Sequence, residues 1–210
     1  MKLEPKGHYH GRLVKEDWEV RDLSLPAARS LVERYHYARG ASNTFVYLHG
    51  LFAKDSSDPV GVAWWLPPTR VACESVNRFQ WKRVLSLSRM VMAPGVPKNA
   101  ASFLLSRSVK LIRREGRFVT LVTYADESQG HTGNVYRASN WIYAGRTGPY
   151  PRWVEPCSGR QVAAKSTVNR TMAQMRSLGY ERQGSFCKHK FVLQLALPNP
   201  DALFSWVTAP

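Results

Sequence analysis

An uninterrupted apolar run at residues 118–124 is the feature that most limits how this chain can fold. Phe118–Tyr124 lacks the alternation of apolar and polar residues that a half-exposed strand shows. A strand of this kind is buried on both faces, as in sheets that carry helices on each side. The run therefore favours an α/β fold with a central sheet.

The rest of the chain supplies strands and helices for such a sheet. Hydrophobic periodicity and turn residues predict strands at 18–23, 44–52, 60–66, 84–92, 141–145 and 188–195, and helices at 27–37, 99–115, 133–140 and 166–178. Ser24 is the expected N-cap of the first helix and Gly40 its stop. We expect a single α/β domain with a mixed central sheet flanked by helices.

Composition marks two segments off from the sheet elements. Residues 1–17 are polar and are expected to form a flexible N-terminal arm before a domain at 18–210. Residues 148–164 hold three prolines and two glycines, which predicts a loop insertion.

Positive charge is concentrated after residue 78. The chain has 30 Lys and Arg against 15 Asp and Glu, a net charge of +15. Residues 1–78 contribute +2, residues 79–148 contribute +8 and residues 149–210 contribute +5. Such a surplus of positive charge favours binding to a polyanion, either nucleic acid or a phosphorylated cofactor. A high net charge can also simply keep a protein soluble.

No segment approaches the roughly 20 apolar residues of a membrane span. The first residues contain no apolar stretch typical of a secretory signal, and the three cysteines show no paired spacing. We therefore expect a cytoplasmic protein without membrane contact. The sequence does not determine the oligomeric state, and a homodimer is one of the assemblies that it allows.

The junction between strand 84–92 and helix 99–115 is a candidate phosphate site. The helix opens at Asn99 after a Pro-Gly-Val-Pro loop, so its first N–H groups and positive dipole end can meet an anion, and Lys98 adds charge. An ordinary strand–helix connection with an asparagine cap explains the pattern equally well. The chain has neither a Walker A motif nor a G-x-G-x-x-G sequence, which disfavours nucleoside triphosphate and dinucleotide folds.

Basic residues recur along that helix at intervals of three and four. The four positions are Arg107, Lys110, Arg114 and Arg117. They predict one basic face able to meet DNA phosphates, with a solvated helix face as the alternative.

A second group of polar residues follows the buried strand. Asp126 lies just past the strand, where open α/β sheets place ligand contacts, and Tyr136 in the next helix can point to the same cleft. A carboxylate there acts as a base or simply caps the loop. His36, at the end of the first helix, is a candidate base or metal ligand, or a partner of the helix dipole.

The order of elements between residues 18 and 145 resembles the GNAT acyltransferases, in which the junction between strand four and helix three binds the pyrophosphate of acetyl-CoA. Here Ala93–Asn99 stands in place of the usual glycine-rich loop. The resemblance implies acetyl-CoA or a related CoA-type donor as cofactor. The residues that would bind it are Met90, Met92, Lys98, Asn99, Ala100 and Ser102.

More specifically, the chain resembles the Mom-type DNA adenine modification proteins of phages, a divergent GNAT branch. The resemblance rests on the order of His36–Tyr37, Leu87–Arg89, Tyr124–Asp126, Gly133–Trp141 and Lys188–Val192. It implies that 18–210 is a catalytic domain with Arg89, Asp126, Tyr136 and His36 at the catalytic centre. It further implies Fe(II) held by His36 and Asp126.

The resemblance implies a transferase that converts adenine in double-stranded DNA to an N6-(carbamoylmethyl) derivative, which protects phage DNA from restriction in the host cytoplasm. The source of the transferred group is open. Two alternatives remain: a conventional acetyl-CoA-dependent N-acetyltransferase acting on a small amine or a protein, and a non-catalytic basic DNA-binding module.

Overall fold

The computed structural model describes residues 11–40, 42–162, 167 and 169–195 of the chain. Within them, seven strands form one mixed sheet in the order β1-β2-β3-β4-β5-β9-β6. β4 and β5 pair in parallel, and the other neighbours are antiparallel. The strands are β1 (Trp18–Asp22), β2 (Tyr47–Ala53), β3 (Pro59–Leu66), β4 (Val84–Met92), β5 (Thr120–Asp126), β6 (Ile142–Arg146) and β9 (Lys188–Gln194). The predicted α/β domain with a mixed sheet is confirmed.

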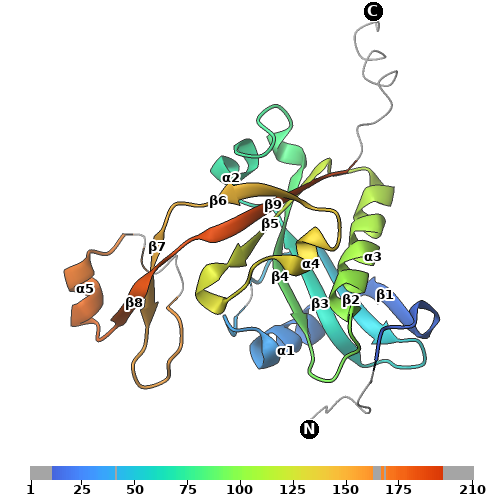
Figure 1. Ribbon diagram of the computed structural model, residues 1–210, viewed down its shortest axis with the longest axis horizontal. Coiled ribbons are helices and arrows are strands. Elements are labelled where there is room, and N and C mark those ends of the chain that lie inside the picture. The colour runs from blue at the N-terminus through green and yellow to red at the C-terminus, as the bar shows by residue number, and fades with distance from the viewer. Residues whose placement is uncertain (1–10, 41, 163–166, 168, 196–210) are drawn as a thin grey trace, which may run out of the picture.

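The two longest helices cover opposite faces of this sheet (Figure 1). α1 (Leu25–Tyr35) packs on the side of Trp64, and α3 (Ala100–Glu115) packs on the side of Trp65. Both tryptophans are fully buried, because successive side chains of β3 alternate between the two faces. The shorter helices are α2 (Arg70–Glu74), α4 (Asn134–Arg137) and α5 (Met172–Ser177), and single 3₁₀ turns lie at Lys15–Asp17, Trp81–Arg83 and Glu127–Gln129.

β4 and β5 diverge toward their carboxyl ends. Their pairing runs from Val84 opposite Thr120 to Leu87 opposite Thr123. Directly after Leu87, β4 contains a bulge whose extra residue is Ser88, because the register with β3 shifts there. The bulge and the divergence leave the edge of β4 from Ser88 onward beside a cavity.

A separate two-stranded sheet, which we call the β7–β8 hairpin although α5 connects its two strands, lies beyond β6 and β9 (Figure 1). It pairs β7 (Tyr150–Val154) with β8 (Glu181–Phe186), and α5 lies between them in the chain. The structure corrects the expected loop at 148–164, since this segment contains β7. β8 gave no sequence signal because its residues are exposed and show no apolar alternation.

Two expected helix boundaries and one expected cap also differ, and the strand expected at 118–124 is β5 at Thr120–Asp126. α1 ends at Tyr35 rather than near Gly40, and Ser24 precedes it without a side-chain capping bond. α5 begins at Met172, where Thr171 forms a capping box, while Ser166 of the expected helix lies outside the described residues.

The expected N-terminal arm is described only in part. Residues 1–10 lie outside the described residues. Residues 11–17 lie against the loop between β4 and α3, where the Leu13 N–H donates to the Lys98 carbonyl and the Lys98 N–H donates to the Gly11 carbonyl. None of the described helices is long and apolar enough to span a membrane.

Candidate active site

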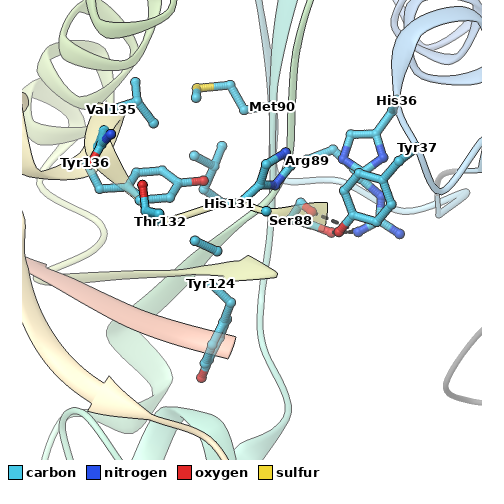
Figure 2. A pocket seen from close by; sticks show the side chains of 15 residues that line it. His36, Tyr37, Ser88, Arg89, Met90, Tyr124, His131, Thr132, Val135 and Tyr136 are labelled. Carbon is cyan, nitrogen blue, oxygen red and sulfur yellow. Dashed lines mark hydrogen bonds between the residues drawn. The ribbon is translucent and has the colours of Figure 1, made fainter. Parts of the chain in front are cut away.

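A cavity of about 360 Å³ lies where β4 and β5 diverge (Figure 2). Its walls come from the bulged part of β4, the end of β5, the loop before α4, and the residues that follow α1. The lining residues are His36, Tyr37, Leu87, Ser88, Arg89, Met90, Tyr124, Ala125, Gly130, His131, Thr132, Gly133, Asn134, Val135 and Tyr136. Three of the four predicted catalytic residues are therefore brought together here.

Tyr136 is carried into the cavity by α4. Gly133 precedes this helix with φ at 80°, and a Cβ atom there would lie 2.2 Å from the Phe191 ring. Only glycine fits this turn, which accounts for its place three residues before Tyr136. The buried Tyr136 side chain reaches toward the middle of the cavity and hydrogen-bonds with Thr123. Burial raises the pKa of Tyr136 despite that bond, so the phenol keeps its proton at neutral pH and can donate it.

Arg89 follows the bulge in β4 and lies at the rim of the cavity. Its Nη1 donates to the Ser88 carbonyl at 2.8 Å, and its Nε donates to the Gly40 carbonyl at 3.3 Å. These bonds hold the guanidinium near His36 and Tyr37 (Figure 2). Within the described residues Arg89 forms no ion pair, so its charge can meet an anionic group in the cavity.

His36 is neutral at physiological pH. Burial, followed by the charges of Arg89 and His131, lowers the pKa of His36 to about 4. Its Nδ1 accepts the Ala38 N–H at 3.1 Å, which places the ring proton on Nε2. The Tyr37 ring centroid lies 4.3 Å from that of His36 and 5.7 Å from that of His131. In this arrangement His36 presents a hydrogen-bond donor rather than a base.

Asp126 ends β5, as the sequence indicates, but does not line the cavity. Its side chain is only about 3% exposed. Oδ1 accepts the Tyr150 hydroxyl at 2.5 Å and the Ser128 N–H at 3.0 Å, and Lys188 Nζ lies 3.9 Å from Oδ2. Burial alone would raise the pKa of Asp126, but the two hydrogen bonds and Lys188 together lower it. Asp126 is thus an ionised carboxylate that joins β5 to β7.

The donor atoms of His36 and Asp126 do not fit the Fe(II) site that the resemblance implies. A histidine ligand must offer a ring lone pair, whereas Nδ1 of His36 is engaged and Nε2 carries the proton. The carboxylate of Asp126 is engaged by Tyr150, Ser128 and Lys188. In the part of the chain that the structure describes, no three His, Cys, Asp or Glu side chains are arranged to hold a metal ion.

The residues expected to bind a CoA-type donor occupy several places. Met90 lines the cavity, while Asn99 and Ser102 line a groove of about 470 Å³ at the start of α3. Asn99 enters that helix with φ at 69°, a left-handed conformation that asparagine tolerates. The other residues of this groove are Leu13, Lys15, Phe103, Ser106, Arg107, Lys110 and Ala138. We name it the α3 groove.

The remaining expected cofactor residues lie outside both hollows. Lys98 is exposed beside Asn99. Ala100 is buried in the core under α3, and Met92 is half-buried at the end of β4.

The predicted basic face of α3 is present for three of its four members. Arg107 and Lys110 line the α3 groove, and Arg114 is exposed one turn farther along. Arg117 lies beyond the end of α3, with its guanidinium 5.1 Å from the Phe118 ring centroid.

The structure gives a place in the site to residues that the sequence grouped with the candidates without assigning them a role. Tyr37 and His131 line the cavity, and Ser88 forms its bulge. Tyr37 adjoins His36 in sequence, and His131 follows Gly130, so a local signal existed for both. No local signal pointed to Tyr150, which reaches Asp126 from a strand that only tertiary pairing defines.

The fold is similar to solved GNAT acetyltransferases. Spermidine N-acetyltransferase from Vibrio cholerae, solved with CoA and spermine, superimposes with a TM-score of 0.51 at 9% identity, covering 86% of this chain and 97% of that one. An acetyltransferase of the GNAT family from Streptococcus pneumoniae gives 0.51 at 9% identity, covering 85% and 99%. At such identities the likeness shows the fold alone.

Sequence comparison identifies the family. A relative from Escherichia phage Mu, named Methylcarbamoylase mom, is 34% identical over 148 residues, which are 65% of this chain and 58% of the phage protein. The match thus spans a little over half the length of that relative. The model of the Mom protein family matches residues 17–195. The chain has a GNAT-like fold with its candidate site between β4 and β5. Because the family model matches most of its length, the chain belongs to the Mom protein family.

Proposed function

We propose that this chain is a transferase that adds a carbamoylmethyl group to N6 of adenine in double-stranded phage DNA. The observation that carries the proposal is the cavity between β4 and β5, which presents Tyr136, Arg89 and His36 in a chain that belongs to the Mom family. The name of the phage Mu relative, a methylcarbamoylase, supports this chemistry. Such a modification would protect phage DNA from restriction in the host cytoplasm.

The target amine sets what the cavity must do. N6 of adenine is inaccessible inside a duplex, so the base must leave the stack, which requires a few kcal/mol. The cavity of about 360 Å³ is a concave, partly aromatic site with which a flipped base would interact. N6 is also a poor nucleophile, because its lone pair is delocalised into the ring, so proton transfer has to accompany its attack.

The polar groups of the cavity suit that proton transfer. The protonated phenol of Tyr136 is placed to donate a proton to the leaving sulfur, and the phenolate formed in this way can take up the proton that N6 releases. The Nε2–H of His36 and the guanidinium of Arg89 are placed to hold a polar or anionic part of the substrate. Asp126 acts as a positioning residue through Tyr150, which holds the adjacent hairpin.

We propose a CoA-type donor for the transferred group. A carbamoylmethyl group is joined to N6 through its methylene carbon, so such a donor would have to carry the group on sulfur through that carbon. The carbon–sulfur bond then breaks as the N6–carbon bond forms, and the sulfur takes up a proton. The free edge of β4 beyond Ser88 offers backbone groups to an extended chain, and the start of α3 with Asn99 and Ser102 offers N–H groups to a pyrophosphate. The spermidine N-acetyltransferase of the same fold was solved with CoA. Lys98, Met90, Met92 and Ala100 would lie along or beneath that path.

The test is nucleoside mass spectrometry of DNA from cells that express the protein. Wild type is expected to produce a modified adenosine, and Tyr136→Phe to reduce its rate of formation by about 100-fold or more, because the ring remains and only the proton donor is lost. Tyr143→Phe is the matched control, since Tyr143 lies on β6 outside the cavity and bonds to His189. It is expected to retain activity.

Each other outcome identifies a different function. Acetyl-CoA turnover that needs no DNA, with unmodified adenosine, would establish a conventional acetyltransferase. Soluble wild-type protein that binds DNA but leaves every adenosine unmodified would indicate a DNA-binding module.

A further inference from the structure

A second hollow adjoins the candidate active site on the side of the β7–β8 hairpin. It has a volume of about 470 Å³ and shares Tyr37 with the cavity. We call it the hairpin groove. Its lining residues are Tyr37, Arg39, Gln129, Arg152, Glu155, Ser158, Gly159, Arg160 and Gln161.

The hairpin groove carries positive charge that no carboxylate compensates. Arg160 forms an ion pair with Glu155, which is the single acidic residue among the described residues that line the groove. Arg39 and Arg152 form no ion pair within the described residues, so two cationic charges remain. Their position in one hollow favours an anion that can lie between them.

Arg152 is held in place with part of its donor capacity unused. Its Nη1 donates to the Ser128 carbonyl at 2.8 Å, which fixes the side chain against the loop after β5. Its Nε is buried and has no hydrogen-bond partner among the described residues. An unsatisfied buried N–H is uncommon, because it loses its hydration without a replacement. A bound anion nearby would favour this arrangement electrostatically.

The cavity and the hairpin groove adjoin each other at Tyr37, which lines both. Its ring lines the cavity that would receive a flipped base and also the groove that contains Arg39 and Arg152. The ring is about 38% exposed, so a strand can run over it. Aromatic faces and basic residues of this kind together bind single nucleotides and the adjoining backbone.

We propose that the hairpin groove binds a phosphodiester of the target DNA strand beside the flipped adenine, through Arg39 and Arg152. This inference rests on the proposed function, and places a DNA contact on the hairpin in addition to the basic face of α3. Residues 150–186 hold six Lys and Arg against two Glu, in agreement with a strand passing along this side. The same phosphate chemistry could belong to a CoA-type donor, and the test separates the two sources.

The experiment measures the dissociation constant for an adenine-containing DNA duplex at several salt concentrations. Each phosphate contact contributes about 0.9 to the slope of log affinity against log salt. Arg39→Gln and Arg152→Gln are each expected to weaken binding several-fold and to lower the slope by about 0.9. Arg78→Gln is the matched control, because Arg78 is an exposed arginine outside every hollow described above. It should leave the slope unchanged.

One further measurement and the choice of variants make the outcome unambiguous. CoA binding, followed by the rise in Tm, is expected to be equal in wild type and both variants; weaker CoA binding with an unchanged DNA slope would overturn the proposal in favour of the donor. Arg39→Gln guards against a folding artefact, because Arg39 has no side-chain hydrogen bond among the described residues and Arg152 does.

Different experimental results would refute the phosphate contact in the groove and the enzymatic function. A wild-type protein that modifies adenosine, with variants whose salt slope is unchanged, would refute the groove and leave the function standing. A wild-type protein that leaves adenosine unmodified, with variants that lower the slope, would refute the function and retain the groove as a DNA contact.

Discussion

Burial and a neighbouring guanidinium decide the protonation of His36. The folded protein holds the pKa of His36 at about 4, whereas an exposed histidine titrates near 6.5. Between these values the unfolded chain binds a proton that the folded chain does not bind. Lower pH therefore favours unfolding across this window, and the effect of His36 is absent above it.

Replacing His36 tests this linkage. The free energy of unfolding of wild type should rise from pH 4 to pH 6.5, and His36→Asn should lose the part of the rise that comes from the ring. The asparagine carbonyl can still accept the Ala38 N–H, so the local turn is retained. Urea unfolding of both proteins at several pH values measures the difference; a difference that is constant with pH would contradict the assigned pKa.

At the scale of elements, the β7–β8 hairpin depends on few contacts with the main sheet. Tyr150 donates to Asp126, Arg152 to Ser128, and Gln129 to Gln161. β8 itself is mostly exposed. A unit with few buried contacts opens more readily than the core.

Tyr150→Phe removes the bond to the buried carboxylate while it keeps the ring. A hydrogen bond to a charged acceptor contributes about 1.5–3 kcal/mol, so amide exchange in β7 and β8 should accelerate by roughly 10- to 100-fold. Exchange in β4 and β5 should change little. Tyr180→Phe, directly before β8, is the control because among the described residues the Tyr180 side chain forms no hydrogen bond that holds the hairpin. Equal exchange in both variants would show that Asp126 does not anchor the hairpin.

At the scale of the whole molecule, two separate basic surfaces border the candidate site. One is the face of α3 with Arg107 and Arg114, and the other is the hairpin groove with Arg39. The arginines of these two surfaces supply part of the net charge of +15. If a DNA duplex contacts both surfaces, the contributions of the two surfaces to the binding free energy should add.

The prediction at this scale is additivity. Arg107→Gln with Arg114→Gln should lower the salt slope for DNA by about 1.8, Arg39→Gln by about 0.9, and the triple variant by about 2.7. Filter binding or fluorescence anisotropy over a salt series measures these slopes. A triple variant no weaker than the stronger single-surface variant would mean that DNA engages only one side.

Local sequence signals predicted much of the sheet. β4 has the predicted bounds 84–92, and α3 differs from its predicted range by a single residue at its start. β4 is long and mostly apolar, and α3 is long and amphipathic, so the local preference of each segment agrees with its position in the fold. β7 and β8 were missed because their pairing joins segments far apart in the chain, and the residues of β8 are mostly exposed.

The sequence by itself determined the α/β class, a buried central strand (expected at 118–124 and found as β5 at Thr120–Asp126), the basic surplus and the position of Tyr136 after Gly133. These depend on hydrophobic periodicity, charge count and backbone preference, which are local properties. Only the tertiary structure decided that Tyr136 and Arg89 share one cavity, that Asp126 bonds to Tyr150 instead of lining it, and that Arg39 and Arg152 meet in a groove. The physical reason is that these contacts depend on segments far apart in the chain. They are set by the divergence of β4 from β5, by burial and by the pairing of distant strands, and no single segment contains this information.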